Sequence, residues 1–166
     1  MSVIKNRRLL KDLEKVQTSI STGDLKDKYE LFVSENNFSQ WKGHLICMED
    51  GIYSGGIFAF EITFLAEYPF KAPQFKFTNV KSIYHPGVSA GGAVCLDMLN
   101  QWNPSNNPLQ LLSAVWEIIN DPELSGSIQS PLQPELAEEF KDTPVLFKAK
   151  ARLCIQRNPV PEMPEI

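Results

Sequence analysis

Three cysteines offer nucleophilic chemistry in this sequence, and one of them, Cys95, lies in a setting unlike the others. It closely follows the pair Gly91 and Gly92, and the run 84–87 before them reads Tyr-His-Pro-Gly. Proline fixes one backbone dihedral and glycine permits positive φ, so this composition predicts tight turns and no long helix. Because a side chain on irregular backbone beside a turn can face another molecule, we expect the Cys95 thiol to be accessible.

The other two cysteines are predicted to be structural. Cys47 falls in an apolar run and Cys154 in a helix-like segment, where a free cysteine usually behaves as a small buried hydrophobe. The odd number of cysteines argues against a disulfide framework, and a chain of 166 residues can bury a core without one. We therefore expect a reducing compartment, the cytoplasm or the nucleus.

A serine hydrolase is one alternative use of the same stretch. Residues 87–91 read Gly-Val-Ser-Ala-Gly and match the G-x-S-x-G nucleophile elbow, with Ser89 as the nucleophile. In that fold the histidine base follows the serine, whereas both histidines of this chain, His44 and His85, precede it. No strand pattern leads into Ser89, so the hydrolase is the less favoured hypothesis.

His85 is predicted to hold the turn rather than to act as a base, because Pro86 follows it directly and limits the reach of the imidazole. A thiol without an adjacent base can still carry an acyl group, since thiolate is a good leaving group and a thioester reacts readily with amines. Such transfer needs a group that stabilises the oxyanion and a site that desolvates the incoming amine.

Metal, phosphate and nucleic-acid sites are not expected. His44 and Cys47 lie three apart in a predicted strand, so their side chains face opposite sides, and no Cys-x-x-Cys pair occurs. The glycines of 51–56 are followed by Ile-Phe where a phosphate loop requires Lys and Ser or Thr, so the chain is not expected to bind ATP or another cofactor. The net charge of −4 disfavours nucleic acid and points to protein partners.

The first segment predicts an amphipathic helix with a basic outer face. Apolar residues recur at helical spacing on one side and basic residues on the other: Leu9, Leu13, Val16 and Ile20 against Lys5, Arg8, Lys11 and Lys15. The segment turns charged before any apolar stretch develops, and no run of about 18 apolar residues occurs anywhere, so neither a secretory signal nor a membrane partner is expected.

Four strands, over 29–33, 41–48, 57–64 and 75–78, are joined by short connections that favour an antiparallel meander. One face of the third strand carries four apolar residues and has to be covered by helices: Phe58, Phe60, Ile62 and Phe64.

Three helices are predicted after the thiol. Asn107-Pro108 is typical of a helix start, and 109–119 is apolar nearly all round, as in a buried helix. Two more helices are predicted over 134–141 and 143–157. The fold class is therefore α+β, with one domain over 1–157 and a tail of prolines and glutamates, 158–166, that is predicted to be disordered.

The order of these parts resembles the ubiquitin-conjugating enzyme family, over roughly 5–157. The motifs that carry the resemblance are Gly55-Gly56-Ile57-Phe58, Tyr68-Pro69-Phe70-Lys71-Ala72-Pro73, Tyr84-His85-Pro86, Cys95-Leu96-Asp97, Trp102-Asn103-Pro104, Asp121-Pro122 and Pro131-Leu132. Each motif is weak alone, but that many in register are specific.

The resemblance implies that Cys95 accepts ubiquitin or a ubiquitin-like modifier as a thioester from an activating enzyme, which consumes the ATP. The modifier then passes to a lysine of a substrate protein with the help of a ligase. The resemblance also implies that Lys5 and Arg8 meet the activating enzyme, and that Phe70 and the Pro104-Ser105 loop meet ligases. It does not indicate which modifier, ligase or substrate is used.

Two departures from the family pattern affect the expected chemistry. The family has His-Pro-Asn where this chain has Gly87, and the loss of an oxyanion donor typically costs roughly a hundred- to a thousandfold in rate. A nearby amide from Asn100, Asn103 or Asn106 could substitute, a ligase could supply the group, or lysine transfer could be slow. The loop 121–131 looks longer than usual and has Ser130 where an acidic residue often precedes Pro-Leu, which makes Asp97 a candidate for positioning the lysine.

The main alternative to the enzyme is a non-enzymatic member of the same family that binds ubiquitin or a partner. Such variants typically lack the cysteine, so Cys95 favours the enzyme, whereas Gly87 favours the binding module.

Overall fold

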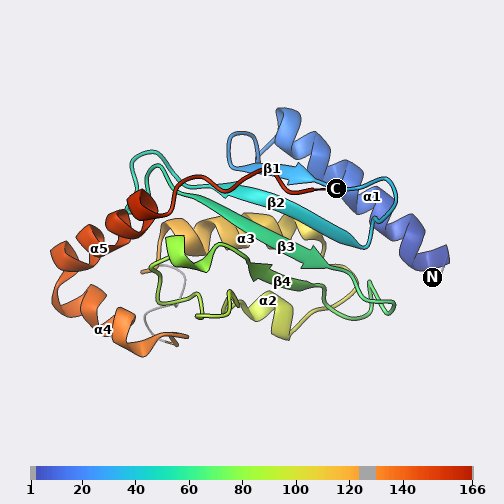
Figure 1. Ribbon diagram of the computed structural model, residues 1–166. Helices are drawn as coiled ribbons and strands as arrows, with labels where there is room; N and C mark the ends of the chain where they lie inside the picture. Colours follow the sequence, from blue (N-terminus) through green and yellow to red (C-terminus); the bar gives the residue numbers. More distant parts are fainter. Residues whose placement is uncertain (1–2, 124–129, 166) are drawn as a thin grey trace.

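The computed structural model describes residues 3–123 and 130–165. Helix α1 (Val3–Thr22) runs along one side of the sheet (Figure 1). Its residues Leu9, Leu13 and Val16 are buried, as the helical spacing predicted.

The predicted basic outer face of α1 is wrong at two of its residues. Lys5 is only 4% exposed, and Arg8 is half-buried. Positions 5, 8 and 12 share one side of the helix because they recur at helical spacing, and Asp12 is buried there too. This side of α1 packs against loops from the rest of the chain, so only part of the basic face, including Lys11 and Lys15, is exposed.

Four strands form one antiparallel sheet in the order β1-β2-β3-β4, as predicted. They are β1 (Tyr29–Phe32), β2 (Gln40–Ile46), β3 (Ile57–Thr63) and β4 (Gln74–Phe77). Period-2 alternation places Phe58, Phe60 and Ile62 on the inner face, where each is at most 1% exposed.

Helix α3 (Pro108–Asn120) covers the inner face of the sheet (Figure 1). Its start is fixed by a capping box. The Asn107 side chain accepts from the Gln110 backbone N–H, and the Gln110 side chain accepts from the Asn107 backbone N–H. The Tyr29 hydroxyl donates to the Leu112 carbonyl at 2.7 Å, and the Trp116 indole donates to the Ile46 carbonyl at 2.9 Å. The buried central helix predicted from the sequence is therefore confirmed.

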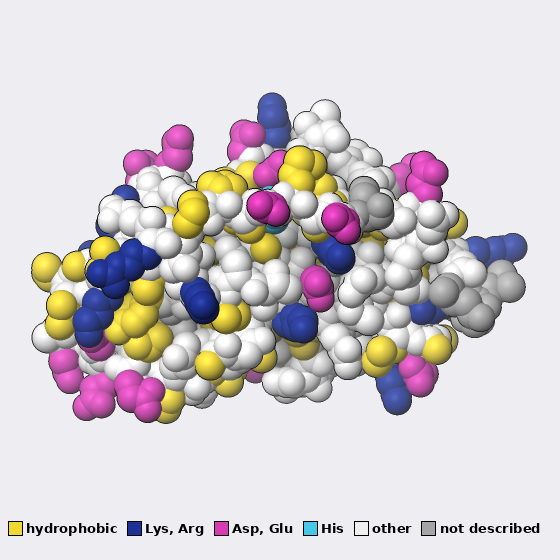
Figure 2. Space-filling view, viewed as in Figure 1, with side chains coloured by type: hydrophobic (Ala, Val, Ile, Leu, Met, Phe, Trp, Pro, Cys, Tyr) yellow, Lys and Arg dark blue, Asp and Glu magenta, His cyan; other side chains and the backbone are white. Residues whose placement is uncertain are grey.

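Helices α4 (Pro134–Asp142) and α5 (Pro144–Arg157) lie side by side at the end of the molecule away from the N-terminus (Figure 1). A 3-10 turn, η1 (Val80–Ser82), follows β4, and a single turn, α2 (Asp97–Asn100), follows the thiol. Figure 2 shows lysine and arginine side chains gathered over α5 and acidic side chains over α4. None of the described helices combines the length and the apolarity that a membrane span requires.

The tail 158–165 contains no helix or strand and crosses the sheet near β2 (Figure 1). Asn158 donates to the Lys81 and Cys154 carbonyls, and the Lys42 ammonium donates to the Glu165 carbonyl at 3.3 Å. The domain boundary at 157 and the disorder of the tail stay predictions.

Candidate active site around Cys95

The thiol loop, residues 84–97, folds back on itself as a small hairpin. Val88 and Val94 form an antiparallel bridge, and the Cys95 backbone N–H donates to the Gly87 carbonyl at 3.2 Å. The turn depends on Gly92, which has φ +92, and a Cβ there would lie 2.1 Å from the Phe77 carbonyl oxygen. Cys95 is thus a free, half-buried thiol at the end of a hairpin, where the turn composition predicted it.

His85 is completely buried and uses both ring nitrogens inside the fold. Its Nε2 lies 2.8 Å from the Ile118 carbonyl oxygen, and its Nδ1 lies 2.9 Å from the Gly87 nitrogen. A carbonyl only accepts and a backbone N–H only donates, so the geometry assigns a neutral imidazole with its proton on Nε2. Burial lowers the pKa of His85 to about 4, although the hydrogen bond to Ile118 opposes this shift. His85 is therefore placed to hold the turn.

A second segment, 131–133, supports the thiol loop from the other side. The backbone N–H groups of Leu132 and Gln133 both donate to the Pro86 carbonyl, at 2.9 and 3.0 Å. The Gln133 side chain donates from Nε2 to the Val88 carbonyl at 2.6 Å. Sequence analysis did not single out Gln133, and its only signal was its place directly after Pro131-Leu132.

Tyr84, at the start of the thiol loop, connects it to α4 and α5. Its hydroxyl donates to Glu139 Oε1 at 2.7 Å, and the Lys150 ammonium donates to Glu139 Oε2 at 2.5 Å. The hydrogen bond from Lys150 holds the pKa of Glu139 below its usual value, and burial holds the pKa of Tyr84 above its usual value. The Tyr84 ring also lies 5.1 Å from the Phe147 ring, so α4 and α5 are anchored on the loop.

The other two cysteines differ in burial, since Cys47 is buried and Cys154 is half-buried like Cys95. Cys47 is 6% exposed, and burial raises its pKa to about 12. Burial also raises the pKa of the half-buried Cys154. A raised pKa keeps a thiol protonated and unreactive, so neither cysteine is placed to act as a nucleophile.

The serine-hydrolase alternative does not fit this geometry. The Ser89 hydroxyl accepts from the Ala93 backbone N–H at 3.0 Å, and His85 faces Ile118. No helix follows Ser89 directly, since the next described helix begins at Asp97. Within 3–123 and 130–165, no cluster of three histidine, cysteine or acidic side chains is arranged to hold a metal ion.

The candidate oxyanion and lysine-positioning residues lie close to Cys95 along the chain but differ in exposure and in the hydrogen bonds that they make. Asp97 is exposed at the start of α2. Asn106 uses both ends of its amide within its own loop, where Oδ1 accepts from the Asn103 backbone and Nδ2 donates to Gln110. Asn100 is exposed, and the side-chain Oδ1 of Asn103 accepts from the Ser105 backbone N–H. Much of the loop 121–131, including 124–129, lies outside the described residues.

The two loops predicted to contact ligases are adjacent, because the Trp102 indole donates to the Pro69 carbonyl at 2.9 Å. Phe70 is 65% exposed at this surface, and Pro104 and Ser105 are exposed as well. All three residues are therefore exposed to solvent, and their contact with a ligase stays a prediction.

Arg8 supports this surface from α1 instead of facing outward. Its guanidinium donates to the Pro104 carbonyl at 2.6 Å, to the Asn106 carbonyl at 2.5 Å and to Asp12 at 2.9 Å. Asp12 also accepts from the Tyr68 hydroxyl at 2.5 Å. The helix predicted to meet the activating enzyme is thus joined to both predicted ligase loops.

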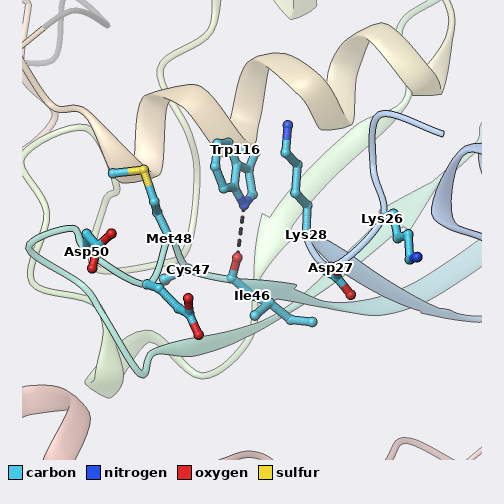
Figure 3. A pocket seen from close by; sticks show the side chains of 9 residues that line it. Lys26, Asp27, Lys28, Ile46, Cys47, Met48, Asp50 and Trp116 are labelled. Carbon is cyan, nitrogen blue, oxygen red and sulfur yellow. Dashed lines mark hydrogen bonds between the residues drawn. The ribbon is translucent and has the colours of Figure 1, made fainter. Parts of the chain in front are cut away.

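A hollow of about 530 Å³ lies beside the thiol loop, between Leu96 and α3. Its walls are mostly apolar, with acidic groups at one side: Met48, Leu96, Ala114, Trp116, Glu117, Ile118, Asn120 and Asp121. A larger hollow of about 640 Å³ lies on the other side of Trp116 (Figure 3). It contains no residue of the thiol loop, and the Lys28 ammonium occupies it 4.4 Å above the indole. Of these two hollows, only the smaller one is lined by a residue of the thiol loop, Leu96.

Comparison with known proteins assigns this architecture to a family. The sequence model described as "Ubiquitin-conjugating enzyme" matches residues 8–155. The chain is 31% identical over 163 residues to Ubiquitin-conjugating enzyme E2 2 of Candida albicans, covering 95% of this chain and 83% of that protein.

Solved structures agree with the sequence comparison. The E2 domain of a Toxoplasma gondii ubiquitin conjugating enzyme superposes with a TM-score of 0.75 at 27% identity, over 92% of this chain and 97% of that chain. A Plasmodium yoelii protein, named as a candidate ubiquitin conjugating enzyme, gives a TM-score of 0.80 at 26% identity, over 98% and 99%. The predicted α+β fold is confirmed, and the chain belongs to the ubiquitin-conjugating enzyme family.

Proposed function

We propose that this chain carries ubiquitin or a ubiquitin-like modifier as a thioester on Cys95 and transfers it to a substrate lysine, with an activating enzyme and a ligase as partners. The placement of Cys95 is the observation that carries the proposal. Cys95 is half-buried at the end of a braced hairpin, and its neighbour Leu96 lines a mostly apolar hollow, whereas Cys47 is buried. Family membership supports the same assignment.

The proposed reaction consists of two acyl transfers. The Cys95 thiolate attacks the carbonyl of the modifier's C-terminal thioester on the activating enzyme, and the thiolate of that enzyme leaves. A substrate lysine amine then attacks the new thioester, Cys95 leaves as thiolate, and the nitrogen loses a proton to form the amide. ATP is consumed only by the activating enzyme, so this chain needs no cofactor of its own.

The hollow beside Leu96 suits the second transfer. We expect its apolar walls to limit the hydration of an incoming amine, and its acidic residues Glu117 and Asp121 to attract a lysine ammonium. Asp97 is exposed near the thiol and stays a candidate for positioning that lysine.

The proposed surfaces for the ligase and the activating enzyme are chosen from residues that are exposed to solvent. Phe70, Pro104 and Ser105 are exposed together and form the proposed ligase surface. The contact of Lys5 and Arg8 with the activating enzyme stays a prediction, and the exposed Arg7 and Lys11 on the same helix are better placed to make it.

The test is a charging assay with activating enzyme, ATP and a panel of ubiquitin and ubiquitin-like modifiers. We expect an adduct that thiols cleave, no adduct for Cys95→Ala, and a normal adduct for the control Cys154→Ala. Charging that survives Cys95→Ala would overturn the assignment of the nucleophile.

The family's binding-module variant is a second candidate, because buried Gly87 offers no side chain to the oxyanion. Lysine discharge from charged protein separates the two functions. A chain that charges but never discharges to lysine, even with a ligase, would support the module. An unchanged rate in Gly87→Asn would show that the missing amide is irrelevant.

A further inference from the structure

The corner at Gly87 is connected to the thiol segment through both polar groups of the Gly87 backbone. Its N–H donates to His85 Nδ1 at 2.9 Å, and its carbonyl accepts from the Cys95 N–H at 3.2 Å. Any movement of this corner is therefore passed directly to Cys95. Because glycine has no side chain and the loosest backbone, the corner depends on neighbouring groups to stay in place.

One residue from another element holds the chain on both sides of Gly87. The Gln133 backbone N–H donates to the Pro86 carbonyl at 3.0 Å, and its side chain donates to the Val88 carbonyl at 2.6 Å. Since a carbonyl only accepts, the amide nitrogen must face Val88, and a glutamate could not replace it. Gln133 is thus hydrogen-bonded to the residues on both sides of Gly87.

The Gln133 side chain does not cap its own helix, α4. Gln133 is the N-cap residue of α4, but its side chain makes no capping hydrogen bond. The helix start is instead set by Pro134, whose fixed φ suits the first helical position. Loss of the Gln133 amide should therefore affect the thiol loop and leave α4 nearly unchanged.

We propose that Gln133 is a positioning residue that braces the thiol loop for lysine transfer. This inference rests on the proposed function of Cys95. Attack by an amine is the slower transfer and requires close alignment with the thioester carbonyl, so it is sensitive to movement of the corner. Charging exchanges one thiolate for another, which is intrinsically fast, and tolerates such movement better.

The first measurement is single-turnover discharge of charged protein to free lysine. For Gln133→Ala we expect a maximal rate lower by roughly fivefold to tenfold, which corresponds to one lost hydrogen bond. The lysine concentration at half-maximal rate and the charging rate should change by less than about twofold. The matched control is Gln156→Ala, which truncates an exposed glutamine on α5 and should change nothing.

A second variant separates the effect of the size of the Gln133 side chain from the effect of its hydrogen bond. Gln133→Glu keeps the size of the side chain but presents an anion to the Val88 carbonyl, so we expect discharge at least as slow as in Gln133→Ala. Full activity of Gln133→Glu, or equal slowing of charging and discharge in Gln133→Ala, would overturn the brace.

Hydrogen exchange tests whether Gln133 holds the thiol loop without requiring an activity assay. In Gln133→Ala, backbone amides of 87–95 should exchange several-fold faster, because the Cys95 N–H depends on the corner. Unchanged exchange would overturn the inference. A wild-type chain that accepts no modifier would instead overturn the proposed function, and the exchange result would still decide whether Gln133 braces the loop.

Discussion

The segment just after β2 and the thiol loop each contain a cysteine, but different interactions hold the two regions. Cys47 is enclosed by packing, and its sulfur lies 3.1 Å from where a Cβ at Gly56 would sit. The thiol loop is instead held by hydrogen bonds between side chains and backbone carbonyls: the His85 imidazole donates to Ile118, and the Gln133 amide donates to Val88. His85 and Val88 of this loop are buried as well, whereas Cys95 at its end is only half-buried. The contrast shows how one fold encloses one thiol and leaves another partly exposed.

Alkylation should show this contrast most strongly. With its pKa raised to about 12, the Cys47 thiol is ionised to only about one part in ten thousand at pH 8. We expect iodoacetamide to modify Cys95 at least roughly a thousandfold faster than Cys47 in the native protein, as read by mass spectrometry of the two peptides. In denaturant the two rates should converge. If Cys47 of the native protein were alkylated within tenfold of the rate of Cys95, the two thiols would not differ in the way that we infer.

A pair of phenylalanines sharpens the comparison in terms of stability. Phe64 is 2% exposed and packs 4.6 Å from the Trp41 ring, whereas Phe70 is 65% exposed. We expect Phe64→Ala to lower the free energy of unfolding by about 3–5 kcal/mol and Phe70→Ala by less than about 0.5 kcal/mol. Urea unfolding of the two variants measures both values. A large loss in Phe70→Ala would show that this residue supports the fold instead of facing a partner.

Local periodicity was enough to predict most of the framework. The alternation through Phe58, Phe60 and Ile62 identified the inner face of the sheet, because the period of a strand does not depend on distant residues. Asn107 and Pro108 identified the start of α3 for the same reason, since a helix cap is made by its immediate neighbours. The place of Cys95 directly after a glycine turn could also be read from the sequence, whereas the accessibility of its thiol stays a prediction, since the residue is half-buried.

Features that depend on distant partners were not predictable in the same way. A helical wheel assigns charged residues to the outside, but Arg8 bonds to carbonyls of Pro104 and Asn106, nearly a hundred residues further along the chain. Lys5 is buried on the same side of α1. Gln133 likewise meets Val88 across 45 positions, and no local pattern signals that contact.

His85 offers the last way to sharpen the comparison, because it holds the thiol loop and titrates in a measurable range. Burial lowers its pKa from 6.5 to about 4, so the unfolded chain binds more protons between these values. Stability from neutral His85 is therefore complete above about pH 6.5 and is lost as the pH falls toward 4, by roughly 3 kcal/mol in total.

The measurement compares urea unfolding of the wild type with His85→Gln at pH 7 and pH 4. The variant should be less stable at pH 7, because the Ile118 carbonyl and the Gly87 N–H lose well-placed partners. The difference between the two proteins should shrink toward pH 4, since only the wild type must protonate a buried imidazole. A difference that stays constant across this range would mean that His85 titrates alike in the folded and unfolded chain, and that the thiol loop does not depend on a neutral imidazole.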